Sequence, residues 1–319
     1  MSEAFGHRTV TDASILRFGS LTGDYARMHF DLDFGPGAGM GGTIAHGLLS
    51  GAWSLGALAQ HAPERLALGE GDAYVAGFSV RFARMVYIGD LFSLRWREGA
   101  GPAAEGLVAP NRMDTDFEVV NQKGEVSTTG TVSVVRGGAD LPVAPTLLDL
   151  GAGASEAVPQ PLYADDMIEH GPRGERLGRT VTEADLVGWT DFVGDLNPAS
   201  LNEPFARAGR FGARIAPPMW TFCRAFGDYL RDLLSVSMPS TGFAGHLGDR
   251  WRFVAPVFVG DTLRTRHRPI TFKRSASRPG MGIVEFAIQV LNQRDEIVQD
   301  GQVAMMIGAR TDAPSQARV

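Results

Sequence analysis

A carboxylate and an imidazole stand five residues apart near the amino terminus, at Asp24 and His29. Five residues separate two side chains by about 140° around a helix, and an odd spacing places them on opposite faces of a strand. The two groups can therefore converge only if the chain between them bends, which the glycine-rich surroundings allow. A converging pair could hold one water molecule and exchange protons with it near neutral pH. The alternative is a structural role, in which Asp24 caps a turn and His29 lies at the surface.

A backbone amide farther along the chain could complete such a site. Residues 46–60 (HGLLSGAWSLGALAQ) are apolar around the whole segment, which predicts a helix buried on most sides. Gly47 would lie in its first turn, where a backbone N–H has no acceptor within the helix. This N–H and the positive end of the helix dipole could stabilise a developing oxyanion. His46, the first residue of the segment, could orient the neighbouring loop or pack in the core.

The elements that must position these groups occur twice, because the sequence repeats itself at a constant offset of 171 residues. One folding unit has therefore been duplicated and fused, and each position has a counterpart for comparison. The matching segments are Arg8-Thr9-Val10-Thr11 and Arg179-Thr180-Val181-Thr182, Gly23-Asp24 and Gly194-Asp195, Ile44-Ala45 and Ile215-Ala216, and Gly89-Asp90 and Gly260-Asp261. Agreement between copies indicates a role in the fold, and we interpret the matched charges Arg81 and Arg252 in this way.

The two copies differ at the groups that could do chemistry. His29 has Ser200 as its counterpart, so only the first unit carries the imidazole. Gly47 has Pro218 as its counterpart, and proline has no backbone N–H to donate. Loss of two cooperating groups from the second copy predicts a single active site, built on the first.

The order of predicted elements is the same in each unit. A short helix and an irregular glycine-rich stretch precede the long apolar helix, and a run of alternating strands follows it. This order predicts an α+β fold in which an antiparallel sheet wraps around one long helix. Two fused units would join their sheets edge to edge and so cover edge strands.

Composition shifts along the chain predict where the units begin and end. Residues 1–136 form the first unit and carry the candidate site, and residues 137–178, rich in glycine and proline, form a connector. Residues 179–310 form the second unit with a degenerate copy of the site, and residues 311–319 form a polar tail.

The composition excludes several functional classes. The formal net charge of −6 gives no broad basic field for nucleic acid, and no apolar run reaches membrane-spanning length. One cysteine, Cys223, permits no internal disulfide, which together with the lack of a signal peptide predicts a cytoplasmic protein. The remaining histidines show no metal-ligand spacing, so we expect neither a metal nor another cofactor.

The motif Gly23-Asp24 through His29-Phe30-Asp31, followed by Ile44-Ala45-His46-Gly47, resembles the hydratase motif of MaoC-like (R)-specific enoyl-CoA hydratases. The second unit resembles it in part, through residues 194–198 and 215–216, so the resemblance spans most of the chain. It implies a hot-dog fold, in the double hot-dog form of fused two-repeat members. The family usually has Asn-Pro where this chain has Ala26-Arg27, a departure that bears on the geometry of the loop.

The resemblance also implies a reaction and roles for residues. The protein would be a carbon–oxygen lyase that hydrates trans-2-enoyl thioesters to (R)-3-hydroxyacyl thioesters, or catalyses the reverse dehydration. Asp24 and His29 would activate the water, and the Gly47 amide would bind the thioester carbonyl. We expect Tyr25, Ile44 and His46 to contact the substrate.

The sequence also bears on the carrier of the thioester, on binding partners and on alternative functions. The thioester could be carried by CoA or by acyl carrier protein, whose phosphates could meet the basic residues Lys273, Arg274 and Arg278; a solvated hairpin tip is the alternative reading of this cluster. We expect no nucleic-acid or membrane partner, while a homodimer is possible. Two other functions stay open: a hot-dog acyl thioesterase, which would use Asp24 without needing His29, and a non-catalytic subunit that binds acyl thioesters.

Overall fold

The same order of elements occurs twice along the chain. The computed structural model describes residues 3–37, 40–97, 111–151, 159–239 and 243–310. The first unit comprises β1 (Phe5–Thr9), α1 (Asp12–Thr22), α2 (Arg27–Phe30), α3 (Phe34–Gly37), α4 (Gly47–His61), η1 (Pro63–Leu66), β2 (Tyr74–Phe82), β3 (Leu91–Arg97), β4 (Arg112–Val120) and β5 (Val126–Val135). The second comprises β6 (Gly174–Thr180), α6 (Glu183–Val193), α7 (Pro198–Leu201), α8 (Glu203–Ala208), α9 (Pro218–Leu233), β7 (Phe243–Phe253), β8 (Thr262–Arg274), β9 (Met281–Leu291) and β10 (Ile297–Gly308).

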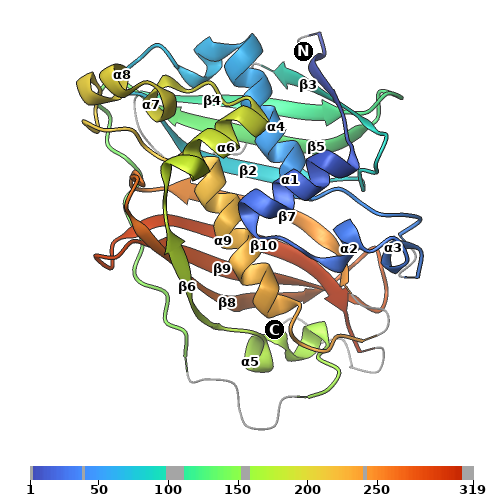
Figure 1. Cartoon of the computed structure of the whole chain (residues 1–319). Coiled ribbons are helices and arrows are strands. Elements are labelled where there is room, and N and C mark those ends of the chain that lie inside the picture. The colour runs from blue at the N-terminus through green and yellow to red at the C-terminus, as the bar shows by residue number, and fades with distance from the viewer. Residues whose placement is uncertain (1–2, 38–39, 98–110, 152–158, 240–242, 311–319) are drawn as a thin grey trace.

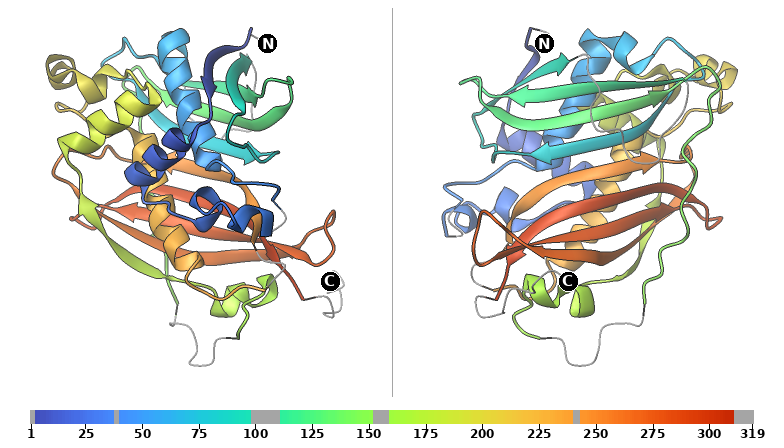
Figure 2. Two further views of the ribbon diagram at one scale, coloured as in Figure 1. Left: turned by 45° about the vertical axis from the view of Figure 1, so that its right-hand side comes forward. Right: turned by 180° about the vertical axis from the view of Figure 1, so that it is seen from behind.

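The ten strands of the described residues form one antiparallel sheet, in the order β1-β3-β4-β5-β2-β7-β10-β9-β8-β6 (Figure 1). The long helices α4 and α9 lie against the same face of this sheet, and the view from behind shows its other face (Figure 2). The units meet where β2 pairs with β7, and the pairs Gly77–Arg252 and Arg81–Gly248 exchange places under the 171-residue offset. The predicted α+β fold and the edge-to-edge joint are both confirmed.

The end of α1 places the candidate carboxylate. Thr11 caps the start of this helix, and its side chain accepts a hydrogen bond from the Ser14 N–H. Gly23 ends the helix in the left-handed conformation, with φ of 79°, and Asp24 follows directly. The second unit repeats this arrangement with the cap Thr182 and with Gly194, whose φ is also 79°.

The two units are locked together through glycines on their long helices. A side chain at Gly56 of α4 would lie 1.9 Å from the carbonyl oxygen of Val193, at the end of α6. Gly227 of α9 is its counterpart, and a side chain there would lie 2.4 Å from the carbonyl oxygen of Thr22, at the end of α1. Each long helix therefore packs directly on the backbone that precedes the aspartate of the other unit.

The segment predicted as a connector contains regular structure. It holds η2 (Ala164–Asp166) and α5 (Met167–His170), and β6 begins at Gly174 and pairs with β8. Its middle part crosses the sheet, where the Leu148 N–H donates to the Gln289 side chain at 2.7 Å. The predicted tail, residues 311–319, lies outside the described residues.

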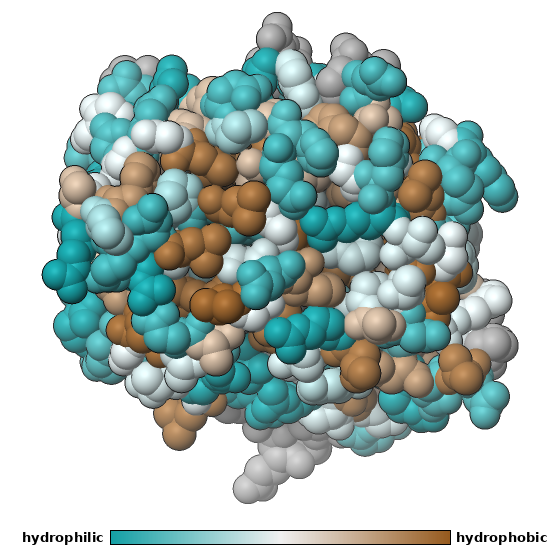
Figure 3. All heavy atoms as spheres, turned by 45° about the horizontal axis from the view of Figure 1, so that its top comes forward, coloured by the Kyte–Doolittle hydropathy of each residue, from teal (hydrophilic) through white to brown (hydrophobic). Residues whose placement is uncertain are grey.

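Apolar side chains also reach the outer surface of the helical layer. Leu16 on α1, Val187 on α6 and Leu196 between α6 and α7 are exposed. Figure 3 shows groups of apolar side chains separated by polar ones on this side of the molecule. Among the described residues, no helix is both long and apolar enough to cross a membrane.

Candidate active site

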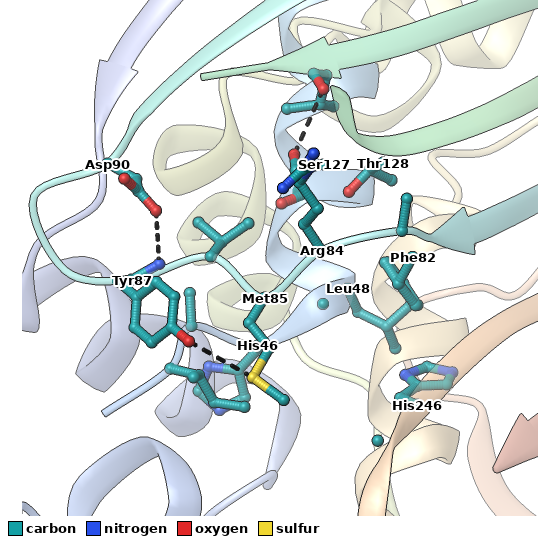
Figure 4. Close-up of a pocket in the computed structure, with 18 of the residues that line it drawn as sticks. His46, Leu48, Phe82, Arg84, Met85, Tyr87, Asp90, Ser127, Thr128 and His246 are labelled. Atoms are coloured by element: carbon teal, nitrogen blue, oxygen red, sulfur yellow. Dashed lines mark hydrogen bonds between the residues drawn. The ribbon is translucent and has the colours of Figure 1, made fainter. Parts of the chain in front are cut away.

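The three predicted catalytic groups border one cavity of about 820 Å³. Figure 4 shows part of its wall, with His46, Phe82 and His246 among the labelled residues. Asp24, His29 and Gly47 line it from the first unit. The second unit contributes Phe226 of α9 and His246 of β7. The cavity therefore lies at the junction of the two units, and both supply its walls.

Asp24 and His29 converge because the chain turns between them. The Asp24 Oδ1 accepts a hydrogen bond from the Ala26 N–H at 3.1 Å, and the short helix α2 then carries His29 back toward the carboxylate. Both side chains are buried, and His29 Nε2 lies 4.0 Å from Asp24 Oδ2. This distance is too long for a direct hydrogen bond. A water molecule about 2.8 Å from both atoms would bridge them with an angle of about 90°.

The tautomer of His29 follows from its second nitrogen. His29 Nδ1 lies 2.8 Å from the carbonyl oxygen of Ile44, which can only accept a hydrogen bond, so Nδ1 carries a proton. In the neutral ring Nε2 then has a free lone pair directed toward the water position. Ile44 lines the cavity and also positions the imidazole through its backbone.

Burial brings the proton affinities of the two groups closer together. Burial raises the pKa of the Asp24 carboxyl from its ordinary value of 3.8, although the attraction of His29 opposes this. Burial lowers the pKa of the His29 imidazole from its ordinary value of 6.5, although the attraction of Asp24 opposes this. The difference between the two proton affinities is therefore smaller than in water, which favours exchange of a proton through one bridging water.

His46 supports this pair from behind. Its Nε2 lies 3.0 Å from the Asp24 carbonyl oxygen and must donate to it, and its ring stacks on His29 with centroids 3.8 Å apart. Burial holds the pKa of His46 well below its ordinary value, so the ring is neutral. His46 therefore fixes the Asp24 backbone and the plane of the His29 ring.

The same three side chains could be considered as metal ligands, since one atom from each lies within 4.8 Å of the others. His46 Nε2, however, carries a proton in its contact with the Asp24 carbonyl. Only the Asp24 carboxylate and His29 Nε2 then offer lone pairs toward their common gap. Two ligands are fewer than the three or four that protein zinc sites use, so this geometry favours a bound water.

Gly47 begins α4, as predicted, and His46 is its N-cap residue. The Gly47 N–H is one of the first amides of the helix, which have no acceptor within it. The ring of Phe82 packs on this residue, and a side chain at Gly47 would lie 3.1 Å from that ring. Pro218 occupies the same position in α9, so the second unit has no equivalent donor.

The second unit keeps the turn but lacks the acid–base pair. Asp195 is buried, and its Oδ1 accepts a hydrogen bond from the Asn197 N–H at 3.3 Å, as Asp24 does from Ala26. Ser200 stands at the histidine position, and its buried Oγ has no hydrogen-bond partner among the described residues. The aspartate therefore holds the turn in both copies, and only the first copy adds an imidazole.

The substitution Asp195→Asn should stabilise the protein at alkaline pH. Burial raises the pKa of Asp195 to about 6, so the folded state binds its proton more tightly than the unfolded state. The contribution of this bound proton to the free energy of unfolding is fully present below about pH 4 and is lost as the pH rises through about 6. At pH 8 the variant should gain up to roughly 3 kcal/mol, because the introduced amide oxygen still accepts the turn hydrogen bond and carries no charge. Denaturant unfolding at pH 5 and pH 8 measures this, and equal gains at both values would contradict it.

The loop that departs from the family motif follows the same path in both units. The Ile44 N–H donates to the Met28 carbonyl at 3.2 Å, and the equivalent Ile215 N–H donates to the Ala199 carbonyl at 3.1 Å. Ala26-Arg27 in the first unit therefore supports the same backbone pairing as the Asn-Pro of the second.

The other predicted site residues are placed unequally. Tyr25 is exposed and borders a separate cavity of about 1090 Å³ beside the end of α9, and it does not line the first cavity. Of the basic cluster, Arg278 lines the first cavity, whereas Lys273 does not. Arg274 forms an ion pair with Asp165 and is absent from the lining.

Two lining residues lacked any signal that singled them out in the sequence. Arg81 matches Arg252, and agreement between the copies favours a structural role, while His246 belongs to a strand with no motif. Both enter the cavity because β2 pairs with β7 across the junction, a contact between distant parts of the chain.

Comparisons with known proteins agree with this architecture. Residues 3–101 match the family described as MaoC like domain, and residues 171–301 match the family described as FAS1-like, dehydratase domain region. The chain is 26% identical over 139 residues to a 3-hydroxybutyryl-CoA dehydratase of Methylorubrum extorquens, covering 44% of this chain and 81% of the relative. It is also 26% identical over 139 residues to an (R)-specific enoyl-CoA hydratase of Rhodospirillum rubrum, covering 39% and 92%.

The fold is similar to that of a solved double hot-dog protein from Mycobacterium tuberculosis. The TM-score is 0.67 at 18% identity, and the similarity covers 96% of each chain. The sheet consists of two equivalent halves, and each half matches a dehydratase family model. The chain is therefore a double hot dog. The first unit is a MaoC-like domain and the second is a FAS1-like dehydratase domain region, and the two are fused in one chain.

Proposed function

We propose that the protein adds water to a trans-2-enoyl thioester to give an (R)-3-hydroxyacyl thioester, or catalyses the reverse dehydration. The observation that carries this proposal is the 4.0 Å gap between Asp24 Oδ2 and His29 Nε2 at the wall of the cavity. Hydratases and dehydratases of CoA thioesters among the relatives support the same reaction class. The first unit would perform the chemistry, and the second would complete the cavity.

The catalytic roles follow from the atoms that face the gap. The thioester carbonyl accepts a hydrogen bond from the Gly47 N–H, which draws electron density from the double bond. The bridging water attacks C3 and gives a proton to the pair, and the pair returns a proton to C2. One C–O bond and one C–H bond form and the C=C double bond is lost, so neither oxidant nor cofactor is consumed. His46 keeps both groups in place.

Ultraviolet absorbance of the conjugated thioester provides the direct test. Hydration of crotonyl-CoA and longer enoyl-CoAs removes the conjugated absorbance between about 260 and 280 nm, and chiral analysis of the product should give the (R) isomer. Release of free thiol would instead indicate the thioesterase alternative. Binding of acyl-CoA without any change in absorbance would indicate a non-catalytic subunit.

Recognition of the carrier phosphates is proposed for Arg81. In the second unit the equivalent Arg252 forms an ion pair with Asp300 at 2.6 Å, on the paired strand β10. In the first unit Arg81 pairs in register with Thr129 of β5 instead. Arg81 is exposed at the cavity and has no carboxylate partner among the described residues. Its charge is therefore available to a phosphate of CoA or of a carrier-bound phosphopantetheine.

Removing or neutralising this charge should weaken carrier binding. We expect Arg81→Ala and Thr129→Asp each to raise KM for crotonyl-CoA about 5- to 10-fold with little change in kcat, because the second variant copies the ion pair of the second unit. Steady-state kinetics measure this, with the exposed Arg207→Ala as the control. The crotonyl thioester of N-acetylcysteamine carries no phosphate, so its KM should not change. An equal effect on both thioesters would contradict a phosphate contact.

We also propose that the protein forms a homodimer and works in the cytoplasm. Exposed apolar side chains on the outer helices, such as Leu16 and Val187, support a homodimer, which light scattering would detect as twice the mass of the chain. A buried, unpaired Cys223 is in keeping with a reducing cytoplasm.

A further inference from the structure

A second histidine–aspartate pair faces the same cavity from the opposite unit. His246 of β7 lines the cavity, and its Nε2 lies 2.8 Å from Oδ1 of Asp249, whose side chain is fully buried. The imidazole stacks on Phe226 with centroids 4.7 Å apart and an interplanar angle of 17°. Phe82 lies against it at 4.7 Å, and Figure 4 shows both at the cavity wall. The ring is thus held by a carboxylate and by two aromatic side chains.

The unused nitrogen of His246 is available to a ligand. Asp249 accepts a hydrogen bond from Nε2–H, which leaves Nδ1 with a lone pair in the neutral ring and with a proton in the charged ring. Nδ1 has no hydrogen-bond partner among the described residues. The ring keeps 13% of its surface accessible, and Phe226 and Met306 line the same cavity, as does Arg278, which contacts the Met306 sulfur at 3.9 Å. A polar group in such surroundings costs free energy unless something pairs with it.

The pair is not a requirement of the fold. Under the 171-residue offset, His246 and Asp249 correspond to Val75 and Phe78, both buried and apolar. The strands share one irregularity of register, between Val75 and Gly77 in β2 and between His246 and Gly248 in β7. Both strands therefore have this irregularity at the same place, and only one of them carries the polar pair.

The His246–Asp249 pair lies on the wall of the cavity that contains the complete acid–base site. The pairing of β2 with β7 brings β7 of the second unit to the cavity of the first unit. His246 therefore lines the same cavity as Asp24 and His29, and under the 171-residue offset its counterpart is Val75, as Asp195 is that of Asp24. Burial raises the pKa of Asp24 and lowers that of His29, and electrostatic interaction with the nearby His246 acts to lower both pKa values, so the three groups share one electrostatic environment.

We propose that His246, oriented by Asp249, determines specificity by a hydrogen bond from the substrate to Nδ1, made by an oxygen on the acyl part. The inference rests on the proposed function for the class of ligand, an acyl thioester. Chemistry at C2 and C3 is already complete with Asp24, His29 and the Gly47 amide. The carrier phosphates are assigned to Arg81, which leaves the pantetheine arm and the acyl part without a polar partner, and the apolar side chains Phe82 and Phe226 against His246 favour the acyl part. A hydroxyl serves either protonation state of the ring, because it can donate or accept.

Binding of saturated thioesters tests this independently of turnover, because they have no double bond to hydrate. Calorimetry would compare ω-hydroxyacyl-CoAs of about four to seven carbons with acyl-CoAs in which a methyl group replaces each hydroxyl. For at least one chain length we expect the hydroxyl to improve binding about tenfold or more in the wild type. His246→Phe keeps the aromatic stacking and should abolish this preference. His246→Phe/Asp249→Asn avoids an unpaired buried carboxylate and should give the same result if the single variant folds poorly.

Each other outcome overturns the assignment. If His246→Phe weakened binding of the hydroxyl-ended and the methyl-ended thioester equally at every chain length, the His246 contact would lie on the pantetheine arm. If binding did not change, the His246–Asp249 pair would be purely structural. The exposed His61, replaced by phenylalanine, serves as the control and should keep the hydroxyl preference. Failure of the proposed function is distinguishable, because it would appear as no hydration of any enoyl-CoA by the wild type while the binding preference could still be measured.

Discussion

Replacing His29 by alanine is expected to lower kcat for hydration of crotonyl-CoA by about 10²- to 10⁴-fold, the usual contribution of a positioned acid–base group. The variant keeps Asp24 and the Gly47 amide but has no lone pair on the other side of the water. Because binding of the thioester carbonyl is retained, KM should change much less than kcat. Stopped-flow absorbance near 260–280 nm would measure the remaining rate.

The duplicated chain supplies a matched control for this experiment. Ser200 occupies the position of His29 in the second unit and is also buried on a short helix. Ser200→Ala should leave the rate unchanged, since no second acid–base pair surrounds it. A His29→Ala protein that is folded by circular dichroism and as active as the wild type would refute the catalytic assignment.

Copying the second unit into the first should remove the oxyanion donor. Gly47→Pro places at the start of α4 the residue that α9 has at Pro218, where helix geometry accepts proline. Losing the N–H should lower kcat about 10²- to 10³-fold, because that hydrogen bond strengthens as charge develops on the thioester oxygen. Single-turnover kinetics with crotonyl-CoA would separate this effect from binding.

Gly47→Ala separates the lost donor from the added bulk. Both variants introduce a side chain 3.1 Å from the ring of Phe82, but alanine keeps the N–H. The alanine variant should therefore retain most of the rate that the proline variant loses. Equal losses in the two variants would show that displacement of Phe82, and not the absent donor, causes the effect.

Local signals predicted the fold well. The apolar segment 46–60 forms a helix one residue farther along, a short helix precedes it, and a run of strands follows it in each unit. These features depend on neighbours in the sequence, which capping preferences and periodicity describe. The repeat then extended each prediction to the second unit, including the edge-to-edge joint of the sheets.

The candidate site was predicted in its residues but only partly in its geometry. A bend between Asp24 and His29 was required and is present, but the gap of 4.0 Å depends on the carbonyl of Ile44 and on the ring of His46. Tyr25 points away from the cavity, because the turn that Asp24 holds exposes the residue between the aspartate and Ala26. Such details depend on packing between segments that no local pattern specifies.

The residues that sequence reasoning missed share one cause. Arg81 has an arginine, Arg252, at the matching position of the second unit, so comparison of the copies favoured a structural role for it. The copies differ on the adjacent strand, where the first unit has Thr129 and the second has Asp300. His246 belongs to the second unit but faces the site of the first. Strand register and the β2–β7 pairing determine which residues lie beside Arg81 and which cavity His246 lines. Residue types alone predict neither the register nor the pairing.

The glycine contact between Gly227 of α9 and the carbonyl of Thr22 has a consequence for how such a chain can diverge. In an assembly of two identical polypeptides, any loss from one catalytic loop would be copied into the other, and both reaction centres would fail. Covalent fusion guarantees one-to-one stoichiometry, so a half that has given up chemistry always meets the half that has kept it. Sequence change in the second half is nevertheless constrained, since a single methyl group at Gly227 would press on the backbone that leads into Asp24.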